Sequence, residues 1–255
     1  MAMAFTEEQV QANKARFIEL INSIEREGTR KEALIAKLDF KAKPNDLNFF
    51  DAPASTKYHL DCKGGLCAHC LNVYDMMVNL VKVFRMEDQI SSDSIKIVAL
   101  LHDFSKLNMY ETTIRARKAY YEGGSKFDDG GAYDWVNEKS YKVKEYEDRF
   151  LYGTHEETSV YMVKFFITLT LPEEIAILHH MSGCDKLLTY NERSDESAVA
   201  TRFPLLTLLH AADYLSTFIL ENDTAVKLMA PIETETEETE EVSEEVTEPT
   251  DEQNN

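Results

Sequence analysis

The chain has 255 residues, enough for one large domain with a buried core or for two small ones. Because 44% of the residues are hydrophobic and 10% are aromatic, we expect most of the chain to fold. No stretch approaches the roughly 20 consecutive apolar residues of a membrane span, and the N-terminal segment has no basic region followed by an apolar run. We therefore expect a cytoplasmic protein without a membrane partner.

The net charge of −19 is concentrated in the C-terminal part of the chain. From Glu233 onward there are 11 acidic residues and no basic one, so residues 1–232 carry 27 basic against 35 acidic residues, or −8. This balance excludes a nucleic-acid binder that relies on a broad basic patch, although a metal ion could supply positive charge to a nucleotide site. We expect residues 222–255 to form a disordered acidic tail, because Glu/Thr-rich sequence without aromatic residues cannot offset its ordering entropy. A partner-binding or nucleic-acid-mimicking tail is the alternative.

The chain has four cysteines, too few for a disulfide scaffold of this length: Cys62, Cys67, Cys70 and Cys184. The spacing of the first three is weakly similar to that of a zinc site, but a second CxxC or HxxxH pair is missing. We therefore interpret the cysteines as reduced, packed thiols, with structural zinc as the alternative.

Residues 1–42 predict an N-terminal helical hairpin packed on the main body. Two capping boxes, Thr6–Gln9 and Thr29–Glu32, mark where the two helices begin. Gly28 fits a stop for the first helix. Four apolar residues share one helical face before it: Val10, Phe17, Ile21 and Ile24.

Residues 43–221 predict a second domain that is mainly helical, so the expected fold class is all-α with a small β insertion. An ordered loop over 44–64 precedes a long amphipathic helix from Leu66 to Phe84. A nearly all-apolar helix, from Ser94 to Leu101, ends at His102 and Asp103. Three further helices are expected at about 156–169, 172–182 and 204–221, with Pro172 in a first turn.

Helical periodicity is absent from about 111–148, where aromatic segments flank a Gly/Asp-rich turn, and this pattern favours a β-hairpin. We consider two roles for this insertion. It is either a surface decoration or a lid beside a site. As a lid, it would offer four basic residues to phosphate: Arg115, Arg117, Lys118 and Lys126.

Seven histidines all lie between positions 59 and 210: His59, His69, His102, His155, His179, His180 and His210. His102 directly precedes Asp103, and Asp213 follows His210 on the last helix. Imidazoles and carboxylates that arrive from different helices of one bundle are what a metal site in a helical core requires. A hydrogen-bonded core histidine is the alternative for each residue taken alone, but their joint position at helix ends favours a metal site.

Three segments resemble one known family. Gly64–His69 reads GGLCAH, Ala99–Lys106 reads ALLHDFSK, and Leu208–Ser216 reads LLHAADYLS. This ordered H…HD…D pattern, with HD continued as HDxxK, resembles the HD-domain metal-dependent phosphohydrolases over about residues 50–220. A histidine upstream of Gly-Gly-Leu, here His59, resembles the sequence variant of HD-type exonucleases and of phage or plasmid HD proteins. This resemblance implies a bacterial or phage-infected cell as the setting. The sequence shows no segment that resembles the accessory nucleic-acid-binding domain of those exonucleases, so we expect their activity to transfer less readily.

The resemblance implies four ligands to a first metal: His69, His102, Asp103 and Asp213. It also implies that Asp103 bridges to a second metal held by His155 and His180. His179 is the alternative to His180, since adjacent helical residues point about 100° apart and only one should face the site. Neutral imidazoles and carboxylates suit one or two divalent transition ions, namely Mn²⁺, Fe²⁺, Ni²⁺ or Zn²⁺.

The resemblance further implies hydrolysis of a phosphoester in a nucleotide or a short nucleic-acid end, with Asp103 and Lys106 as catalytic residues. Metal lowers the pKa of bound water and neutralises phosphoryl charge, and Lys106 would present a cation to the phosphate. His210, one turn before Asp213, either orients that carboxylate or is structural. Two other functions stay open: a di-iron oxygenase of the same fold, and a non-catalytic HD module that binds a nucleotide or, through the acidic tail, a partner.

Overall fold

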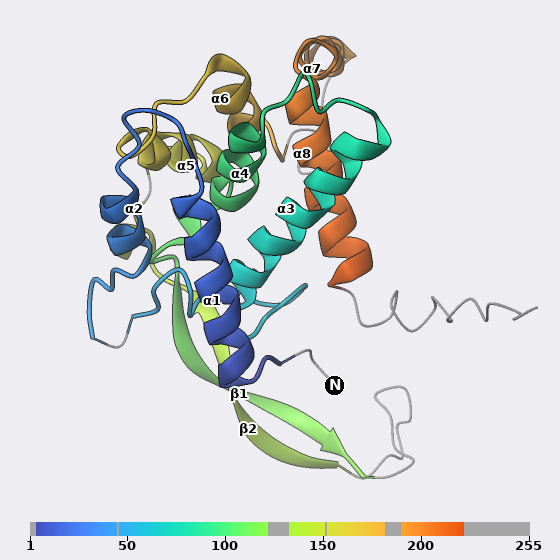
Figure 1. Cartoon of the computed structure of the whole chain (residues 1–255). Helices are drawn as coiled ribbons and strands as arrows, with labels where there is room; N and C mark the ends of the chain where they lie inside the picture. The colour runs from blue at the N-terminus through green and yellow to red at the C-terminus, as the bar shows by residue number, and fades with distance from the viewer. Residues whose placement is uncertain (1–3, 45, 122–132, 151, 182–189, 222–255) are drawn as a thin grey trace, which may run out of the picture.

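The computed structural model describes most of the chain, in five ranges: residues 4–44, 46–121, 133–150, 152–181 and 190–221. Within these ranges eight α-helices form a body, and two long strands form an antiparallel hairpin (Figure 1). The expected mainly helical architecture with a β-hairpin insertion is confirmed. The expected disordered tail, 222–255, lies outside the described residues, as do Lys126 and Cys184.

The first helix, α1 (Glu7–Asn22), begins where its capping box predicts. The Thr6 hydroxyl accepts a hydrogen bond from the Gln9 amide, and the Gln9 side chain accepts one from the Thr6 amide. These bonds satisfy N–H groups that the first turn of a helix leaves free. The helix ends well before Gly28, the expected stop. Gly28 has a positive φ of 76° and belongs to the turn that follows.

The second helix, α2 (Lys31–Leu38), does not use its predicted capping box. Its N-cap is Arg30, which makes no side-chain capping bond, and the Thr29 hydroxyl is buried without a hydrogen-bond partner among the described residues. The Thr29–Glu32 prediction is therefore wrong. The Arg30 amide instead donates to the Phe166 carbonyl at 2.8 Å, so a tertiary contact replaces the local capping signal.

Six further helices complete the body: α3 (Gly65–Val83), α4 (Ser92–Leu101), α5 (His155–Lys164), α6 (Leu171–Leu178), α7 (Tyr190–Arg202) and α8 (Pro204–Leu215). α3 is central and contacts α1, α4 and α8 (Figure 1). A π-helical turn, Ser216–Leu220, continues α8 and leads to Glu221. The sequence predicted all of these helices except α7, whose residues are mostly polar and lack an apolar period.

The buried apolar side chains form two main clusters. One joins the N-terminal helices, the 44–64 loop and α3, and Phe17 packs edge-on against Phe50 within it. The other joins α3, α4, α6 and α8. Cys67 and Cys70 are buried in the first cluster as free thiols, and burial raises the pKa of the Cys67 thiol to about 12. The packed-thiol interpretation agrees with this environment.

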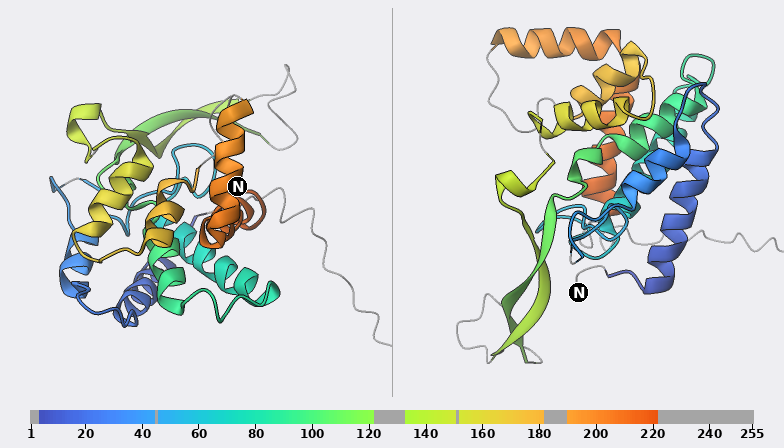
Figure 2. Two further views of the ribbon diagram at one scale, coloured as in Figure 1. Left: turned by 90° about the horizontal axis from the view of Figure 1, so that it is seen from above. Right: turned by 90° about the vertical axis from the view of Figure 1, so that its left-hand side faces the viewer.

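The hairpin consists of β1 (Tyr110–Tyr120) and β2 (Tyr133–Val143). Figures 1 and 2 show that it projects away from the helices. A buried ion pair anchors its base, because the Lys144 ammonium lies 2.8 Å from Asp46 and donates to Asn108 at 2.6 Å. The basic residues on its described strands do not line the pocket that contains the histidines, so their position does not support the lid interpretation.

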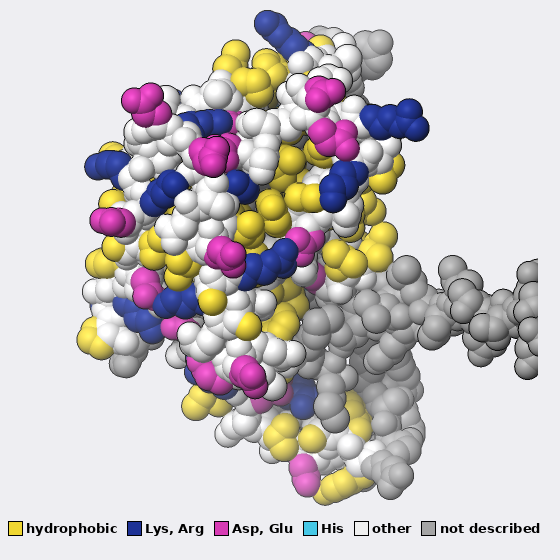
Figure 3. Space-filling model, in the orientation of Figure 1, with side chains coloured by type: hydrophobic (Ala, Val, Ile, Leu, Met, Phe, Trp, Pro, Cys, Tyr) yellow, Lys and Arg dark blue, Asp and Glu magenta, His cyan; other side chains and the backbone are white. Residues whose placement is uncertain are grey.

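On the face in Figure 3, lysine and arginine side chains are interspersed with aspartate and glutamate rather than gathered into a basic patch. No single helix in the described part of the chain is long and apolar enough to cross a membrane. One pair of segments, Ser194–Arg202 and Pro204–Leu220, meets the length and composition criteria only when taken together, across a 105° bend.

Candidate metal centre

The histidines and carboxylates singled out by the sequence converge on one pocket of about 780 Å³. Six of the seven residues expected in the site line it: His69, Asp103, Lys106, His155, His180 and Asp213. The seventh, His102, is fully buried, and its ring centroid lies 5.4 Å from that of His69 and 5.0 Å from that of His180. The structure therefore brings the whole expected set together.

The double glycine before α3 positions His69. Gly64 has a φ of 80°, which favours glycine, and a Cβ atom on Gly65 would collide with the Leu60 carbonyl oxygen. α3 can therefore begin tightly against the loop that precedes it. Nε2 of His69 then lies 3.2 Å from Oδ1 of Asp213 on α8.

α4 ends in the site, with His102 as its C-cap and Asp103 immediately after it. Nδ1 of His102 lies 3.0 Å from the Ala99 carbonyl oxygen, and it must carry the ring proton because a carbonyl can only accept a hydrogen bond. Nε2 lies 3.5 Å from Oδ2 of Asp103. This nitrogen is buried and has no hydrogen-bond partner among the described residues.

His180 repeats this arrangement just after α6. Its Nδ1 donates to the Ile177 carbonyl at 2.7 Å, and its Nε2 lies 3.9 Å from Oδ1 of Asp103. That Nε2 is also buried, again without a hydrogen-bond partner in the described ranges. His210 donates through Nδ1 to the backbone carbonyl of His180 at 2.8 Å, a contact that fits the structural role considered for it.

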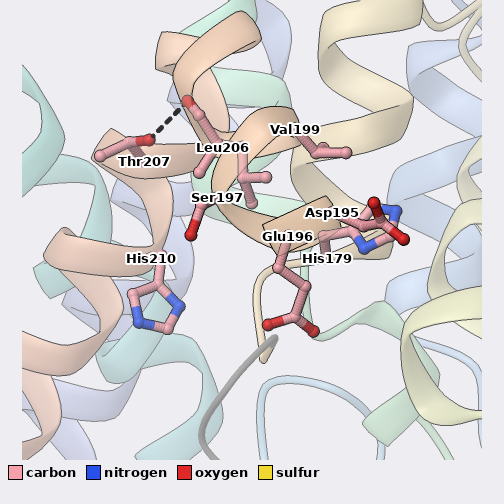
Figure 4. Close-up of a pocket in the computed structure, with 9 residues that line it drawn as sticks. His179, Asp195, Glu196, Ser197, Val199, Leu206, Thr207 and His210 are labelled. Atoms are coloured by element: carbon pink, nitrogen blue, oxygen red, sulfur yellow. Dashed lines mark hydrogen bonds between the residues drawn. The ribbon is translucent and has the colours of Figure 1, made fainter. Parts of the chain in front are cut away.

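The neighbouring His179 faces a different pocket of about 340 Å³, next to α7 and α8 (Figure 4). Asp195 and Glu196 of α7 and Thr207 of α8 also line this second pocket. Of the two adjacent histidines, His180 therefore joins the cluster.

Burial lowers the pKa of His180 to about 4 and also lowers the pKa of His102, because a charged imidazolium is disfavoured away from water. Both rings are therefore neutral near pH 7. A neutral imidazole with its proton on Nδ1 presents the lone pair of Nε2, the usual metal-binding atom of histidine. Two such lone pairs approach Asp103, one from the end of α4 and one from the end of α6.

Asp103 and Lys106 form a buried ion pair beside these rings. Nζ of Lys106 lies 2.7 Å from Oδ2 of Asp103 and donates to the Ala54 carbonyl at 3.0 Å. Burial opposes the charge of Asp103, but Lys106 and the nearby imidazoles hold its pKa well below the usual range. Burial likewise opposes the lysine charge, and Asp103 outweighs it and raises the pKa of Lys106. Both groups are ionised near pH 7.

Glu221 is a buried site residue that the sequence analysis did not identify. Its two carboxylate oxygens lie 3.0 and 3.1 Å from Nδ1 of His69, and one accepts a hydrogen bond from the Asn72 amide at 2.9 Å. Burial disfavours the imidazolium of His69, but Glu221 and Asp213 outweigh it and raise the pKa of that ring to about 10. Its position at the start of the acidic tail gave no signal that separates it from the other glutamates.

His59 extends the row of imidazoles from the 44–64 loop. Its ring centroid lies 5.1 Å from that of His69, and its Nε2 lies 3.8 Å from Oε2 of Glu221. Burial lowers the pKa of His59 to about 4. Among the described residues, neither of its ring nitrogens has a hydrogen-bond partner. The sequence placed His59 in a family variant but not among the ligands.

His155 is the first residue of α5, whose N-cap is Thr154. Its ring centroid lies 5.2 Å from that of His180, and its Nδ1 lies 3.1 Å from Oε2 of Glu156. The side chain is 27% exposed, so it stands at the edge of the cluster.

Three overlapping groups of donor atoms are compact enough to hold an ion, each with its atoms within 4.8 Å of one another. They are His59, His69 and Glu221; His69, His102 and Asp213; and His102, Asp103 and His180. No described cysteine and neither His155 nor His179 belongs to these groups. Imidazole nitrogens and carboxylate oxygens suit divalent transition metals, and buried donors without a partner are rare unless they serve a ligand. The residues present therefore fit a metal ion.

Comparison of the chain with protein-family models, with curated proteins and with solved structures finds no match in any of the three. The side chains of this pocket are consequently the main basis for a functional assignment. The three HD-like motifs contribute to it only through the positions of their own residues.

Proposed function

We propose that the chain is a divalent-metal-dependent phosphohydrolase built on a helical bundle of the HD-domain type. One observation carries the proposal: two buried, neutral imidazoles, His102 and His180, direct Nε2 atoms that have no hydrogen-bond partner among the described residues toward the Asp103 carboxylate. A carboxylate between donors from two helices is suited to bridge two ions. The order of the motifs along the chain supports the same family.

Four residues would hold the first ion: His69, His102, Asp103 and Asp213. Asp103 and His180 would hold the second, with His155 beside it as an outer ligand. Mn²⁺, Fe²⁺, Ni²⁺ and Zn²⁺ all suit these donors. When bound, such an ion lowers the pKa of water and neutralises charge on a phosphoryl group.

Lys106 would bind the phosphoryl group of the substrate. Its ammonium has three N–H donors, of which two are directed to Asp103 and the Ala54 carbonyl. The third is available to a phosphate oxygen in the pocket, which Lys106 lines. The raised pKa of Lys106 keeps this donor charged over the whole physiological range.

The dimensions and rim of the pocket support a nucleotide or a nucleic-acid end as substrate. A volume of about 780 Å³ lies within the range of small-molecule sites. Tyr58, Tyr214 and Phe218 line it and are exposed, and the last two rings lie 4.6 Å apart between centroids. Exposed aromatic rings at a pocket rim can stack on a base. Lys106 is the sole lysine or arginine among the described lining residues, which favours one phosphoryl group at the centre.

Hydrolysis by purified protein tests this proposal. The chain is stripped with a chelator, reloaded with Mn²⁺ and incubated with nucleoside mono- and triphosphates, cyclic dinucleotides and single-stranded oligonucleotides. We expect hydrolysis by the reloaded protein alone. Asp75→Asn, which alters an exposed ion pair with Arg16 outside the pocket, should retain activity. It is the matched control for the same substitution at a carboxylate inside the pocket, Asp103→Asn.

Three other outcomes would contradict the proposal. Metal-loaded protein that turns over none of these phosphoesters is not a phosphohydrolase of this class. Oxygen uptake by Fe²⁺-loaded protein would favour the di-iron oxygenase, and nucleotide binding without turnover would favour the non-catalytic module.

The metal content of a double variant tests whether a second ion binds at His155 and His180. Replacing both His155 and His180 by Ala should lower the bound Mn²⁺ from about two ions to about one per chain, because removing ligands reduces affinity directly. His179→Ala, one residue away and facing the other pocket, is the control and should keep the wild-type content. Elemental analysis of proteins purified in parallel measures the ratio. Wild-type protein that holds a single ion at saturation would contradict the dinuclear arrangement.

A further inference from the structure

The β-hairpin collects aromatic and basic side chains on one of its two faces. Residues that oppose each other across the ladder share a face, and the register pairs Ile114 with Lys139, Lys118 with Trp135, and Tyr120 with Tyr133. We call these six residues the aromatic face. Every other residue that the register of β1 and β2 places on the same side is uncharged.

The two faces of the hairpin differ in whether their basic side chains form ion pairs. On the opposite face Arg117 pairs with Glu138 at 2.8 Å, and Lys142 pairs with Glu111 at 2.9 Å. The two lysines of the aromatic face have no carboxylate partner in the part of the chain that the structure describes. One of them, Lys118, instead lies over the Tyr133 ring, 4.0 Å from its centroid. Lys139, nearer the helical body, lines a pocket with Asp46 and Asp51 but makes no described ion pair with either, so the unpaired positive charge of the aromatic face is greatest at Lys118.

The aromatic face is also open to solvent. Ile114 is 74% exposed and Trp135 is 64% exposed. A two-stranded hairpin is marginally stable in water unless one of its faces packs against something, and the strands extend beyond the helical body (Figures 1 and 2). Exposed aromatic patches with a polar border mark interaction sites.

We propose that the aromatic face binds a single-stranded nucleic acid. Bases would stack on Tyr133 and Trp135, and the ammonium groups of Lys118 and Lys139 would meet the phosphates. Charge complementarity favours this occupant, because the face has two lysines and no carboxylate. A second copy of the chain would instead set the same lysines against each other. Because the chain as a whole is acidic, with a net charge of −19, the rest of the surface should repel a polyanion, which would therefore bind at this face.

The aromatic face leads to the metal pocket. Met109 lines that pocket and directly precedes β1. The Tyr110 hydroxyl donates at 3.3 Å to the Ala54 carbonyl, which also accepts from Lys106. A strand held on the hairpin would thus have an end near the proposed phosphate site. This last step rests on the proposed phosphohydrolase function and narrows its substrate to a nucleic-acid end, whereas binding by the hairpin does not depend on it.

The fluorescence of Trp135 tests the binding, since it is the sole tryptophan of the chain. Full-length protein in EDTA is titrated with single-stranded RNA and, separately, single-stranded DNA of about 12 nucleotides. We expect both to quench the fluorescence, and added salt to weaken the binding, because phosphate contacts release counterions. A duplex of equal length should quench less, because its bases are already stacked. No quenching at about 100 μM oligonucleotide, the weak limit of non-specific binding, would overturn the proposal.

Matched charge reversals locate the binding. Lys118→Glu should weaken it about tenfold, whereas Arg115→Glu, the same charge change on the opposite face of the same strand, should weaken it less than about threefold. Anisotropy of a labelled oligonucleotide measures both variants. Trp135→Phe should retain binding and Trp135→Ala should lose it, with melting curves to show that each variant folds.

Equal losses in the two reversals would mean that net charge alone matters, and would overturn the assignment to this face. Concentration-dependent self-association that buries Trp135 without nucleic acid would assign the face to a second copy. If the oligonucleotides bind and metal-loaded protein hydrolyses nucleotides but none of the oligonucleotides, the narrowing to a nucleic-acid end fails. If it hydrolyses no phosphoester at all, the proposed function fails while the binding face stands.

Discussion

Helices α4 and α6 share a polar network near their N-terminal ends, and each is followed closely by a buried histidine at its C-terminal end. Near the N-terminal ends, the fully buried Glu173 accepts hydrogen bonds from Arg26 at 2.6 Å, from the Ser94 hydroxyl at 2.7 Å and from the Thr170 amide at 2.8 Å. At the C-terminal ends, His102 and His180 each bind a backbone carbonyl through Nδ1 and leave Nε2 without a partner in the described ranges.

This difference in hydrogen bonding indicates that one end of the helix pair serves stability and the other end serves ligand binding. A buried polar atom without a partner costs about 1–3 kcal/mol, so native proteins seldom keep one without a use for it. The Glu173 network is satisfied internally and should contribute stability alone. In the histidine cluster, Nε2 of His102 and Nε2 of His180 have no hydrogen-bond partner in the described part of the chain, as expected of atoms that bind a ligand. Changes at the two ends should therefore affect different measurements.

The largest expected effect is on activity. Asp103→Asn should lower metal-dependent turnover at least about 1000-fold, or roughly 4 kcal/mol, because the bridging charge between the two imidazoles is lost. The free energy of unfolding should also fall, by about 3 kcal/mol, because the Lys106 ammonium loses its counter-charge and keeps only its bond to Ala54, so turnover is compared per folded molecule. Turnover and urea unfolding of the same preparation measure both. A variant with near wild-type turnover would remove Asp103 from the site.

A change near the N-terminal ends of the two helices should affect stability and leave turnover unchanged. Glu173→Gln should lower the free energy of unfolding by about 3 kcal/mol, because it leaves the Arg26 guanidinium without its counter-charge in a partly buried site. Turnover and metal content of the folded fraction should stay unchanged. Glu174→Gln is the adjacent control. It alters a surface pair with Lys164 and should cost less than about 1 kcal/mol. Equal destabilisation by both variants would show that the network has no special role.

The same two ends also differ in how far the sequence predicts them. The histidine end lies in short motifs, so the end of α4 at His102 and Asp103 followed from the local order of residues. The site roles of these residues and the preference for His180 over His179 were implied by the family resemblance, since helix geometry required only that one of the two face the site. The Glu173 network joins Arg26 to a residue 147 positions away, and no local pattern encodes that pairing. Thr29 shows that a local signal can also mislead, because its capping box is not formed and the neighbouring Arg30 amide bonds to the Phe166 carbonyl instead.

Two further features escaped the sequence for physical reasons. α7 is mostly polar and has no apolar stripe, so helical periodicity does not reveal it. Glu221 reaches His69 across 152 positions because a π-helical turn extends α8, and such turns have no reliable sequence signal. The proposed metal ligands were thus more predictable than the side chains that contact them.

That distinction gives a test of the supporting residues. Glu221→Gln should weaken Mn²⁺ binding about 10- to 100-fold, because the carboxylate fixes the ring of His69 through Nδ1 and increases its basicity. Competition with a metal-binding dye measures the affinity. Asn72→Ala, which removes a hydrogen bond to Glu221 but leaves the bonds between Glu221 and His69 in place, should have a smaller effect. Unchanged affinity in Glu221→Gln would make this contact structural only.

The smallest expected effect is on the pH dependence of stability in the metal-free protein. The pKa of His180 and that of His59 are lowered to about 4, and the pKa of His102 is lowered too, chiefly because burial disfavours the charged rings. The unfolded chain, with histidine pKa values near about 6.5, therefore binds more protons than the folded chain below that pH. Stability should consequently rise with pH between about 4 and 6.5, by up to about 1.4 kcal/mol per pH unit for each ring.

His69 has the opposite sign and does not interfere in this window. Its pKa is raised to about 10, so its contribution is fully present below about pH 6.5 and is lost as the pH rises toward 10. Urea unfolding in EDTA between about pH 5 and 6.5 therefore isolates the neutral rings, and His180→Asn should reduce the slope by about 1 kcal/mol per pH unit. His59→Asn should give a similar and separate reduction. If His180→Asn and wild type have the same slope, the ring of His180 is protonated in the folded protein, and the Nε2 lone pair on which the proposed metal site depends does not exist.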